Sequence, residues 1–313
     1  MSTGERTVLG RMSPFAMLIF SSLGVVVVGL VFQLLGLLVS TMIFDVSTFE
    51  LMDFEGSADK HVIHAVKLLQ IIGALGTFVF SSLLLSFLYT GRWLGFFPFG
   101  KEPGGRSVIL LIVIMLFSLP LVNFLTELNM RLEIPFSGIE NYFRQMDEQT
   151  EKLMMTMVRA DNIGALLVNL FMIAIIPAVG EELVFRGLIQ RHLADLFRNP
   201  HVAIVLASVI FSLMHFQVYS FLPRFFLGML LGYAFHYGRS IWYPMIAHLV
   251  NNALGVVFYY FYSRGEAGDS LEEIGTFEMM PATALFSFVA VTLLMVAWIR
   301  MVAADRSGGP VIP

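Results

Sequence analysis

The sequence predicts an all-α protein, a polytopic membrane helix bundle that forms a single membrane domain over residues 1–313. Two observations on composition and one on pattern lead to this fold class. Hydrophobic residues make up 57% of the chain, only 13% of the residues are charged, and the mean hydropathy is +0.80. One soluble core of this length cannot bury so much apolar surface, so the excess must face lipid. The apolar residues also form long uncharged runs, most of them close to the ~20 residues that cross a bilayer.

We expect about eight transmembrane helices, one for each uncharged apolar run. In chain order the runs are 14–44, 68–90, 107–126, 162–180, 199–223, 225–238, 240–263 and 279–299. The run 225–238 is too short on its own and is expected to begin inside the preceding turn. The first run is about twice as long as the apolar core of a signal peptide and lacks a small-residue cleavage site, so we expect it to be retained.

Orientation follows from the loops, because Lys and Arg near span ends collect on the cytoplasmic side. With the N-terminus inside, most of the 19 lysines and arginines fall in inner segments, and the longer loops 45–66, 127–161 and 263–280 lie outside. We therefore expect an integral protein of the bacterial inner membrane with both termini cytoplasmic. Apolar residues at helical spacing in 131–160 predict an amphipathic helix in the membrane interface, and an ordinary connecting helix has the same pattern.

Charge and composition exclude several classes of function. The net charge of −4 and the pI near 6.0 provide no basic field for a nucleic-acid partner. The chain has no cysteine, which excludes disulfides, thiolate metal sites and cysteine nucleophiles. The expected partners are membrane lipid and a membrane-associated peptide or protein.

Two adjacent glutamates and an arginine follow the run 162–180, where the chain continues past Pro177 into Glu181, Glu182 and Arg186. We expect one helix with a kink near Pro177. Each charge at the centre of a membrane helix costs ~2.5–3.5 kcal/mol, so these side chains need partners or water. Glu182 and Arg186 have the spacing of a helical ion pair, and Glu181, about 100° round the helix, is left for another partner. A charged group just beyond the end of a span would look the same.

Two later spans place polar groups deep in apolar sequence. One carries Phe211 and His215, and the other carries His248 and Asn252; each pair is four residues apart and shares a helix face. Amide hydrolysis by activated water requires a base, a group that orients the base and hydrogen-bond donors for the oxyanion. A glutamate carboxylate, the two imidazoles and the asparagine amide could together supply these groups. A single membrane histidine can also simply hydrogen-bond a neighbouring helix.

The rest of the sequence adds no second set of catalytic residues. The other histidines are expected to be surface or interfacial groups: His61, His64, His192, His201 and His236. The sequence contains no His-Glu-x-x-His, no Gly-x-Gly-Asp and no Gly-x-Ser-x-Gly, which disfavours the other membrane-protease mechanisms.

The three motifs, in this order, resemble those of the CPBP intramembrane proteases, the CAAX-prenyl protease and bacteriocin-processing family. In this sequence they are Glu181-Glu182-x-x-x-Arg186, Phe211-x-x-x-His215 and His248-x-x-x-Asn252. The motif-bearing core covers about residues 160–262. The resemblance implies an intramembrane endopeptidase whose substrate is a membrane-associated protein, prenylated or lipid-anchored proteins included.

The resemblance also implies a role for each motif residue. The implied catalytic residues are Glu181, Glu182, Arg186, His215, His248 and Asn252. In that mechanism Glu181 and His215 activate a water. His248 and Asn252 stabilise the tetrahedral intermediate, while Glu182 and Arg186 support the base.

The resemblance leaves two catalytic types open, metal-dependent and glutamate-dependent. Glu181, His215 and His248 could supply the three protein ligands of a catalytic zinc, with water in the fourth position. A water held only by Glu181 and His215 needs no metal, and we expect no tightly bound zinc or other cofactor.

Two other functions fit the same residues. A non-catalytic immunity or scaffold protein would keep the motifs for structure, and its function would not respond to Glu181→Ala. A proton-coupled transporter also uses carboxylates and histidines inside membrane helices, but the sequence has no clear paired repeat of broken helices.

Overall fold

The computed structural model describes residues 7, 9–52, 59–100, 102–264, 275–276 and 281–307. Within them the chain is helical and has no strand, which confirms the all-α class. The α-helices are α1 (Pro14–Phe44), α2 (Thr48–Met52), α3 (Lys60–Ala74), α4 (Ser81–Thr90), α5 (Gly105–Met130), α6 (Ser137–Val158), α7 (Ile163–Asn169), α8 (Ile176–Glu182), α9 (Arg191–Phe197), α10 (Pro200–Leu213), α11 (Phe221–Gly238), α12 (Trp242–Ser263) and α14 (Pro281–Ser307). Three π-helical segments, η2 (Leu75–Phe80), η3 (Leu170–Ile175) and η4 (Leu183–Gln190), join α3 to α4, α7 to α8 and α8 to α9; η1 (Leu9–Arg11) and η5 (Val218–Ser220) are short 3₁₀ turns.

The described residues contain six helices that are long and apolar enough to cross a membrane. They are Pro14–Phe44, Lys60–Thr90, Gly105–Met130, Ile163–Phe197, Val218–Gly238 and Pro281–Asp305. The polytopic membrane bundle is therefore confirmed, whereas the predicted number of eight spans is not. α10 has only 14 residues, and α12 has 22 residues but carries His248, Asn251 and Asn252 in its middle. The span predicted from 225–238 does begin earlier, as expected, at Val218.

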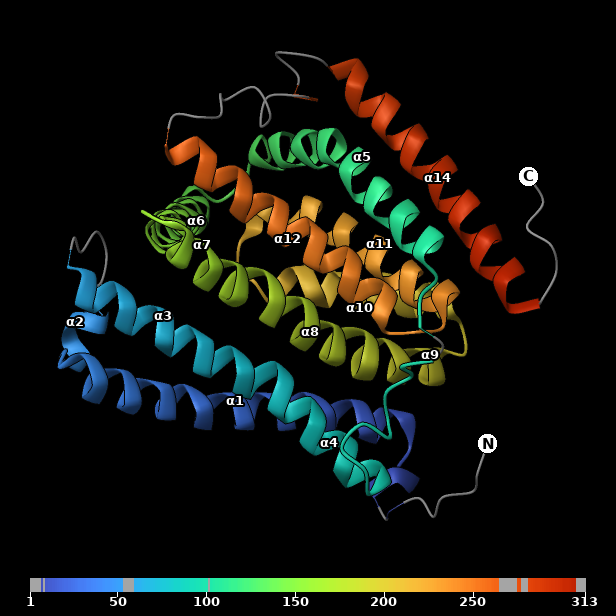
Figure 1. Ribbon diagram of the computed structural model, residues 1–313, viewed down its shortest axis with the longest axis horizontal. Helices are drawn as coiled ribbons and strands as arrows, with labels where there is room; N and C mark the ends of the chain where they lie inside the picture. Colours follow the sequence, from blue (N-terminus) through green and yellow to red (C-terminus); the bar gives the residue numbers. More distant parts are fainter. Residues whose placement is uncertain are drawn as a thin grey trace.

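The helices form three layers (Figure 1). α1 lies along α3 and η2 on one side, and α5 lies along α14 on the other. Between these pairs lie the helix that runs from α7 to α9 and the helices α10, α11 and α12. α12 contacts η3, α8, α5 and α11, so it occupies the centre of the bundle and can bring its polar residues to several neighbours.

α1 shows how small and large side chains are distributed between the interior and the outer surface of the bundle. Its buried residues are mostly small: Ser21, Val25, Gly29, Gly36 and Ser40. Large side chains such as Leu30 and Leu34 are 62% and 67% exposed. Small residues let helix backbones approach closely inside a membrane, and large apolar residues turned outward fit a lipid environment.

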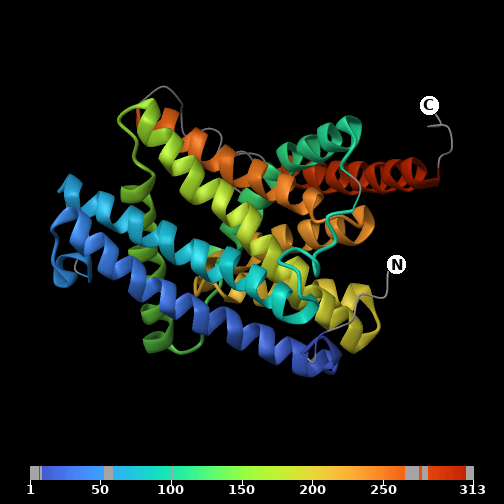
Figure 2. The same cartoon turned by 60° about the horizontal axis from the view of Figure 1, so that its bottom comes forward.

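Two features distinguish the ends of the bundle. α1 begins and α14 ends at the same end (Figures 1 and 2). At the opposite end α6, which lies within the predicted amphipathic segment 131–160, runs crosswise to α1 and α3. This direction suits a helix that lies along a membrane surface, which is what its amphipathic pattern predicts.

The helix that carries the two glutamates is continuous from Ile163 to Phe197, and its regular winding is interrupted twice by π turns. Pro177 is the second residue of α8, which begins where η3 ends. Because proline has no N–H and its ring crowds the preceding turn, a regular α-helix could not pass this residue unchanged. The carbonyl of Ile173, four residues earlier, accepts a hydrogen bond from Asn252 Nδ2 at 3.0 Å instead. Short π segments of this kind are frequent at functional sites.

α10 is shorter than the run 199–223 predicts. The helix ends at Leu213, His215 lies in the turn that follows, and Phe216 adopts a left-handed conformation with φ of 54°. Ser212 Oγ donates to the carbonyl of Phe221 at 2.7 Å, which holds the start of α11 against the end of α10. The prediction of one span through residue 223 was therefore wrong, and His215 lies beyond a helix end instead of deep within a span.

Candidate active site

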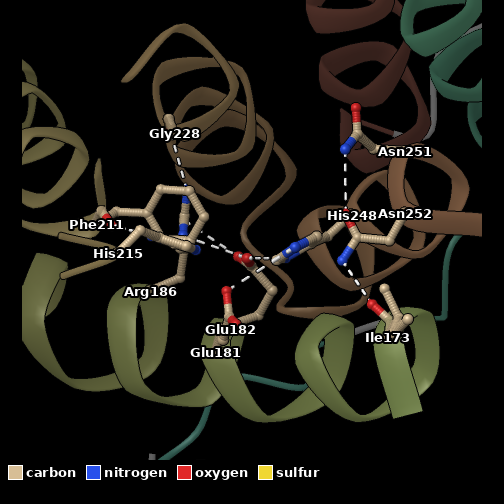
Figure 3. Close-up of polar contacts among 10 residues, drawn as sticks. All are labelled: Ile173, Glu181, Glu182, Arg186, Phe211, His215, Gly228, His248, Asn251 and Asn252. Atoms are coloured by element: carbon tan, nitrogen blue, oxygen red, sulfur yellow. Dashed lines mark hydrogen bonds and ion pairs between the residues drawn. The ribbon is translucent and has the colours of Figure 1, made fainter. Parts of the chain in front are cut away.

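Glu182 is the centre of a buried polar network (Figure 3). Its side chain has 0% exposure, and its Oε2 lies 3.1 Å from Nε of Arg186. The predicted ion pair between these two residues is thus present. His248 Nδ1 donates to Glu182 Oε1 at 2.8 Å, and Arg186 Nη2 donates to the carbonyl of Gly228 at 3.0 Å. Two opposite charges and two hydrogen bonds are what a buried pair needs to offset the loss of water.

Glu181 has a different environment from its neighbour. Its side chain is 13% exposed, and its Oε2 lies 3.9 Å from His248 Nε2, which is too long for a direct hydrogen bond. His248 therefore lies between the two glutamates, with Nδ1 on Glu182 and Nε2 toward Glu181. A carboxylate oxygen can only accept, so Nδ1 carries the proton of this hydrogen bond, and in the neutral form of the ring Nε2 would be an acceptor.

The ring of Phe211 connects the three motifs. Its centroid lies 5.2 Å from that of His215, 6.1 Å from that of His248 and 5.1 Å from Cζ of Arg186. His215 Nδ1 donates to the carbonyl of Phe211 at 2.9 Å, which fixes the ring just beyond the end of α10. Five of the predicted side chains thus come together from three separate segments, with the phenylalanine packed among them (Figure 3).

Asn252, the sixth predicted residue, lies one helical turn after His248 on α12 and faces the kinked helix. Its Nδ2 donates to the Ile173 carbonyl, and its Oδ1 accepts from Asn251 Nδ2 at 3.1 Å. An amide nitrogen carries two N–H groups, so one remains for another acceptor. Asn252 thereby links α12 to the turn that precedes Pro177.

Glu181, His215 and His248 are the three candidate zinc ligands. Within the part of the chain that the structure describes, no group of three or more His, Cys, Asp or Glu side chains is arranged to hold a metal ion. The Nδ1 atoms of His248 and His215 are engaged by Glu182 and by the Phe211 carbonyl. The Nε2 atoms of both rings remain for a water or a metal, since metal-binding histidines usually donate their other ring N–H to a carboxylate or a carbonyl in this way.

Sequence analysis did not identify the partners on α11. Arg186 donates to the carbonyl of Gly228, and Gln190 Nε2 donates to that of Gly232 at 3.1 Å, so two side chains four apart match two carbonyls four apart. A Cβ at Gly228 would lie 2.9 Å from Cβ of Ser208, so only glycine lets α10 approach this closely. The Gly-x-x-x-Gly spacing, typical of close membrane-helix contacts, is the signal that could have identified this surface.

Arg224, one turn before Gly228 on α11, is a further charge near the site. It donates to the side chain of Gln217 and interacts electrostatically with Glu181. A cavity of about 670 Å³ beside the turn that carries His215 is lined in part by Arg224, Gln217 and Tyr219.

His192 corrects one prediction. It was expected near a surface, yet it is 1% exposed, its Nε2 lies 3.2 Å from Ser21 Oγ, and its ring meets Tyr89 edge-on with centroids 6.0 Å apart. The physical reason is that α9 continues the central helix and packs against α1 instead of ending in water.

Comparison with known families gives one match. Residues 163–254 match the family described as Rce1-like, type II CAAX prenyl endopeptidase Rce1-like. The matched segment contains all three motifs, which confirms the resemblance that they indicated. Comparison with curated proteins and with solved structures found no match.

Proposed function

We propose that this chain is an intramembrane endopeptidase, because residues 163–254 match the family described as Rce1-like, type II CAAX prenyl endopeptidase Rce1-like. Its substrate is a membrane-associated peptide or protein, and prenylated or lipid-anchored chains belong to this class. The observation that carries the proposal is the position of His248 between Glu182 and Glu181, at 2.8 Å and 3.9 Å.

The acceptor atoms Glu181 Oε2 and His248 Nε2 form a pair that suits a catalytic water. A water that donates one proton to each atom has its oxygen lone pair directed away from both, toward an incoming carbonyl carbon. Glu182 and Arg186 act behind this pair. The hydrogen bond from Nδ1 to Glu182 fixes the His248 ring and its tautomer, much as a buried carboxylate orients a catalytic histidine in other hydrolases.

Hydrolysis then needs no group beyond these side chains and one water. The water oxygen attacks the carbonyl carbon of the scissile peptide bond while one proton of the water passes to Glu181. When the C–N bond breaks, the leaving nitrogen takes this proton from Glu181, and the products are a new carboxyl group and a new amine.

His215 and Asn252 complete the proposed site. We assign the second amide N–H of Asn252 to the oxyanion of the tetrahedral intermediate, since its first N–H is used by Ile173. His215 Nε2, which the bond from Nδ1 to Phe211 orients, assists Glu181 in holding the water. The cavity beside Gln217 and Arg224 is the proposed polar approach for the peptide.

The decisive experiment uses the purified full-length chain in detergent. Wild type and Glu181→Ala are incubated with a library of membrane peptides, with and without a prenyl group, and the products are read by mass spectrometry. Cleavage by wild type alone supports the proposal. A chain that cleaves nothing, or a cellular function indifferent to Glu181→Ala, would favour the scaffold alternative.

Metal dependence is tested in the same assay. We propose that no tightly bound zinc takes part, so incubation with 1,10-phenanthroline and removal of the chelate should leave the rate within about twofold. A loss that zinc restores would assign Glu181, His215 and His248 to a metal instead.

We also propose that both termini are cytoplasmic in a bacterial inner membrane. Reporter fusions after residues 100 and 305 should then signal the inside, and a fusion after residue 270 the outside. An outside signal at residue 305 would reverse this orientation.

A further inference from the structure

A second group of charged side chains surrounds a cavity of about 760 Å³ at the end of the bundle where α6 lies. We call it the end pocket; its walls come from α3, α6, α7, α12 and the link between α6 and α7, and its polar lining includes Lys60, His64, Lys67, Arg159, Asp161 and Tyr259. None of these residues takes part in the proposed hydrolysis.

The charges around the end pocket are unbalanced. Asp161 lies 3.6 Å from Lys60 Nζ and 3.8 Å from Arg159 Nε, so one carboxylate is shared by two cations. All three side chains are at least 63% exposed, and such pairs contribute little in water. Lys67 adds a third cation, which leaves an excess of positive charge in the cavity.

Lys67 is the group that points to a ligand. It is only 7% exposed, and its Nζ donates to Asn169 Oδ1 at 2.8 Å. Asn169 in turn donates to the carbonyl of Val158 at the end of α6. The amide oxygen satisfies one of the three N–H groups of the ammonium. Among the described residues no carboxylate forms an ion pair with Lys67, and a buried charge without a counter-ion is strongly unfavourable.

The position of the end pocket indicates what kind of anion would reach it. Its lining residues come mainly from the starts of α3 and α7 and from the C-terminal part of α6, the helix that runs crosswise in Figures 1 and 2. Ile63, Met155 and Ala165 give it apolar walls next to the cations. With α6 lying along the membrane surface, as its amphipathic pattern predicts, the pocket would be at the level of the lipid headgroups, and basic pockets between membrane helices bind lipid head groups.

We propose that the end pocket binds the phosphate of an anionic phospholipid headgroup, with Lys67 as the buried contact and Lys60 and Arg159 at the rim. The bound lipid would bring a negative charge between α3, α6 and α7, which are already tied through Lys67, Asn169 and Val158. It would thus stabilise the start of the helix that carries the two glutamates.

The test measures thermal melting of the full-length chain in detergent against added phosphatidylglycerol, phosphatidylcholine with the same acyl chains, or inorganic phosphate. Phosphatidylglycerol should raise the melting temperature in a saturable way. Lys67→Met should weaken its apparent affinity about tenfold or more, the loss expected for a charge-assisted contact. Lys152→Met, which removes an exposed lysine of α6 outside the pocket, is the matched control and should change the affinity less than about twofold.

A second variant keeps the proposal falsifiable if Lys67→Met does not fold. Lys60→Met combined with Arg159→Met leaves the contact between Lys67 and Asn169 intact and should also weaken phosphatidylglycerol binding about tenfold. Equal shifts with both lipids, or equal affinities in the pocket variants and Lys152→Met, would overturn the site. Inorganic phosphate alone could also raise the melting temperature as much as phosphatidylglycerol does, in a way that depends on Lys67. That result would assign the pocket to free phosphate and overturn the proposal of a lipid ligand.

Discussion

α1 and the central helix Ile163–Phe197 are both long enough to cross a membrane, but they are built in opposite ways. α1 buries mostly small residues and turns leucines outward, so close backbone approach makes most of its contacts, and Ser21 adds a hydrogen bond to His192. The central helix buries Glu182, Arg186 and Gln190 and contains two π turns. The first helix is specified by shape, whereas the second depends on individual polar partners. Substitutions should therefore have graded, local effects in α1 and large, residue-specific effects in the central helix.

The largest effect is expected at Glu181. Glu181→Gln keeps the shape of the side chain but removes the base, so kcat should fall by roughly 10²–10⁴-fold. The melting temperature should change little, because among the described residues Glu181 has no ion-pair partner closer than the 3.9 Å contact with His248. Turnover and thermal melting are measured on the same preparation. A folded, fully active Glu181→Gln would remove Glu181 from the mechanism.

Glu182→Gln should instead act mainly on stability. It leaves the guanidinium of Arg186 buried without its counter-charge, and breaking a buried pair in this way costs about 3–5 kcal/mol. The glutamine oxygen can still accept from His248 Nδ1, so part of the activity should remain. Chemical or thermal unfolding in the detergent used for Glu181→Gln gives the comparison. If Glu182→Gln is the stable, inactive variant and Glu181→Gln the unstable, active one, the two roles are reversed.

Asn252 and Asn251 offer a matched pair on α12. Asn252→Ala leaves the Ile173 carbonyl without its donor, which should cost about 1–3 kcal/mol of stability. It should also lower kcat by about 10²–10³-fold if its second N–H serves the oxyanion. Asn251→Ala removes only the contact to Asn252 Oδ1 and should have a smaller effect on both quantities. Similar losses of stability and kcat in the two variants would show that the hydrogen bond from Asn252 to the Ile173 carbonyl has no special role.

The smallest effects are expected in α1. A Cβ at Gly29 would lie 2.7 Å from Thr77 Oγ1, so Gly29→Val should destabilise the bundle by about 1–3 kcal/mol through overpacking. Leu34→Ala, on the face turned outward, should stay within about 0.5 kcal/mol of wild type. Melting temperatures in one detergent are sufficient for this test. A large loss at Leu34 with none at Gly29 would contradict the packing described for α1.

Three features could be predicted from the sequence alone: the membrane fold class, the continuous central helix and the ion pair between Glu182 and Arg186. Each of these depends on local pattern: uncharged runs of membrane length, an apolar run that continues past Pro177, and a spacing of four residues. The family resemblance was likewise available, because three short motifs in order are a property of the chain alone.

The tertiary structure decided which partner each polar group has. Whether His248 faces Glu181, Glu182 or both depends on how α12 packs against α8 and η3 of the central helix. The early end of α10 at Leu213 could not be read from the run 199–223, since hydropathy does not distinguish an apolar turn from an apolar helix. His192 was misplaced for a related reason: a polar residue near a charged stretch is buried when the surrounding helices supply a partner such as Ser21. The local sequence shows which polar side chains need a hydrogen-bond or ion-pair partner. The packing of helices that are distant in sequence determines which residue that partner is.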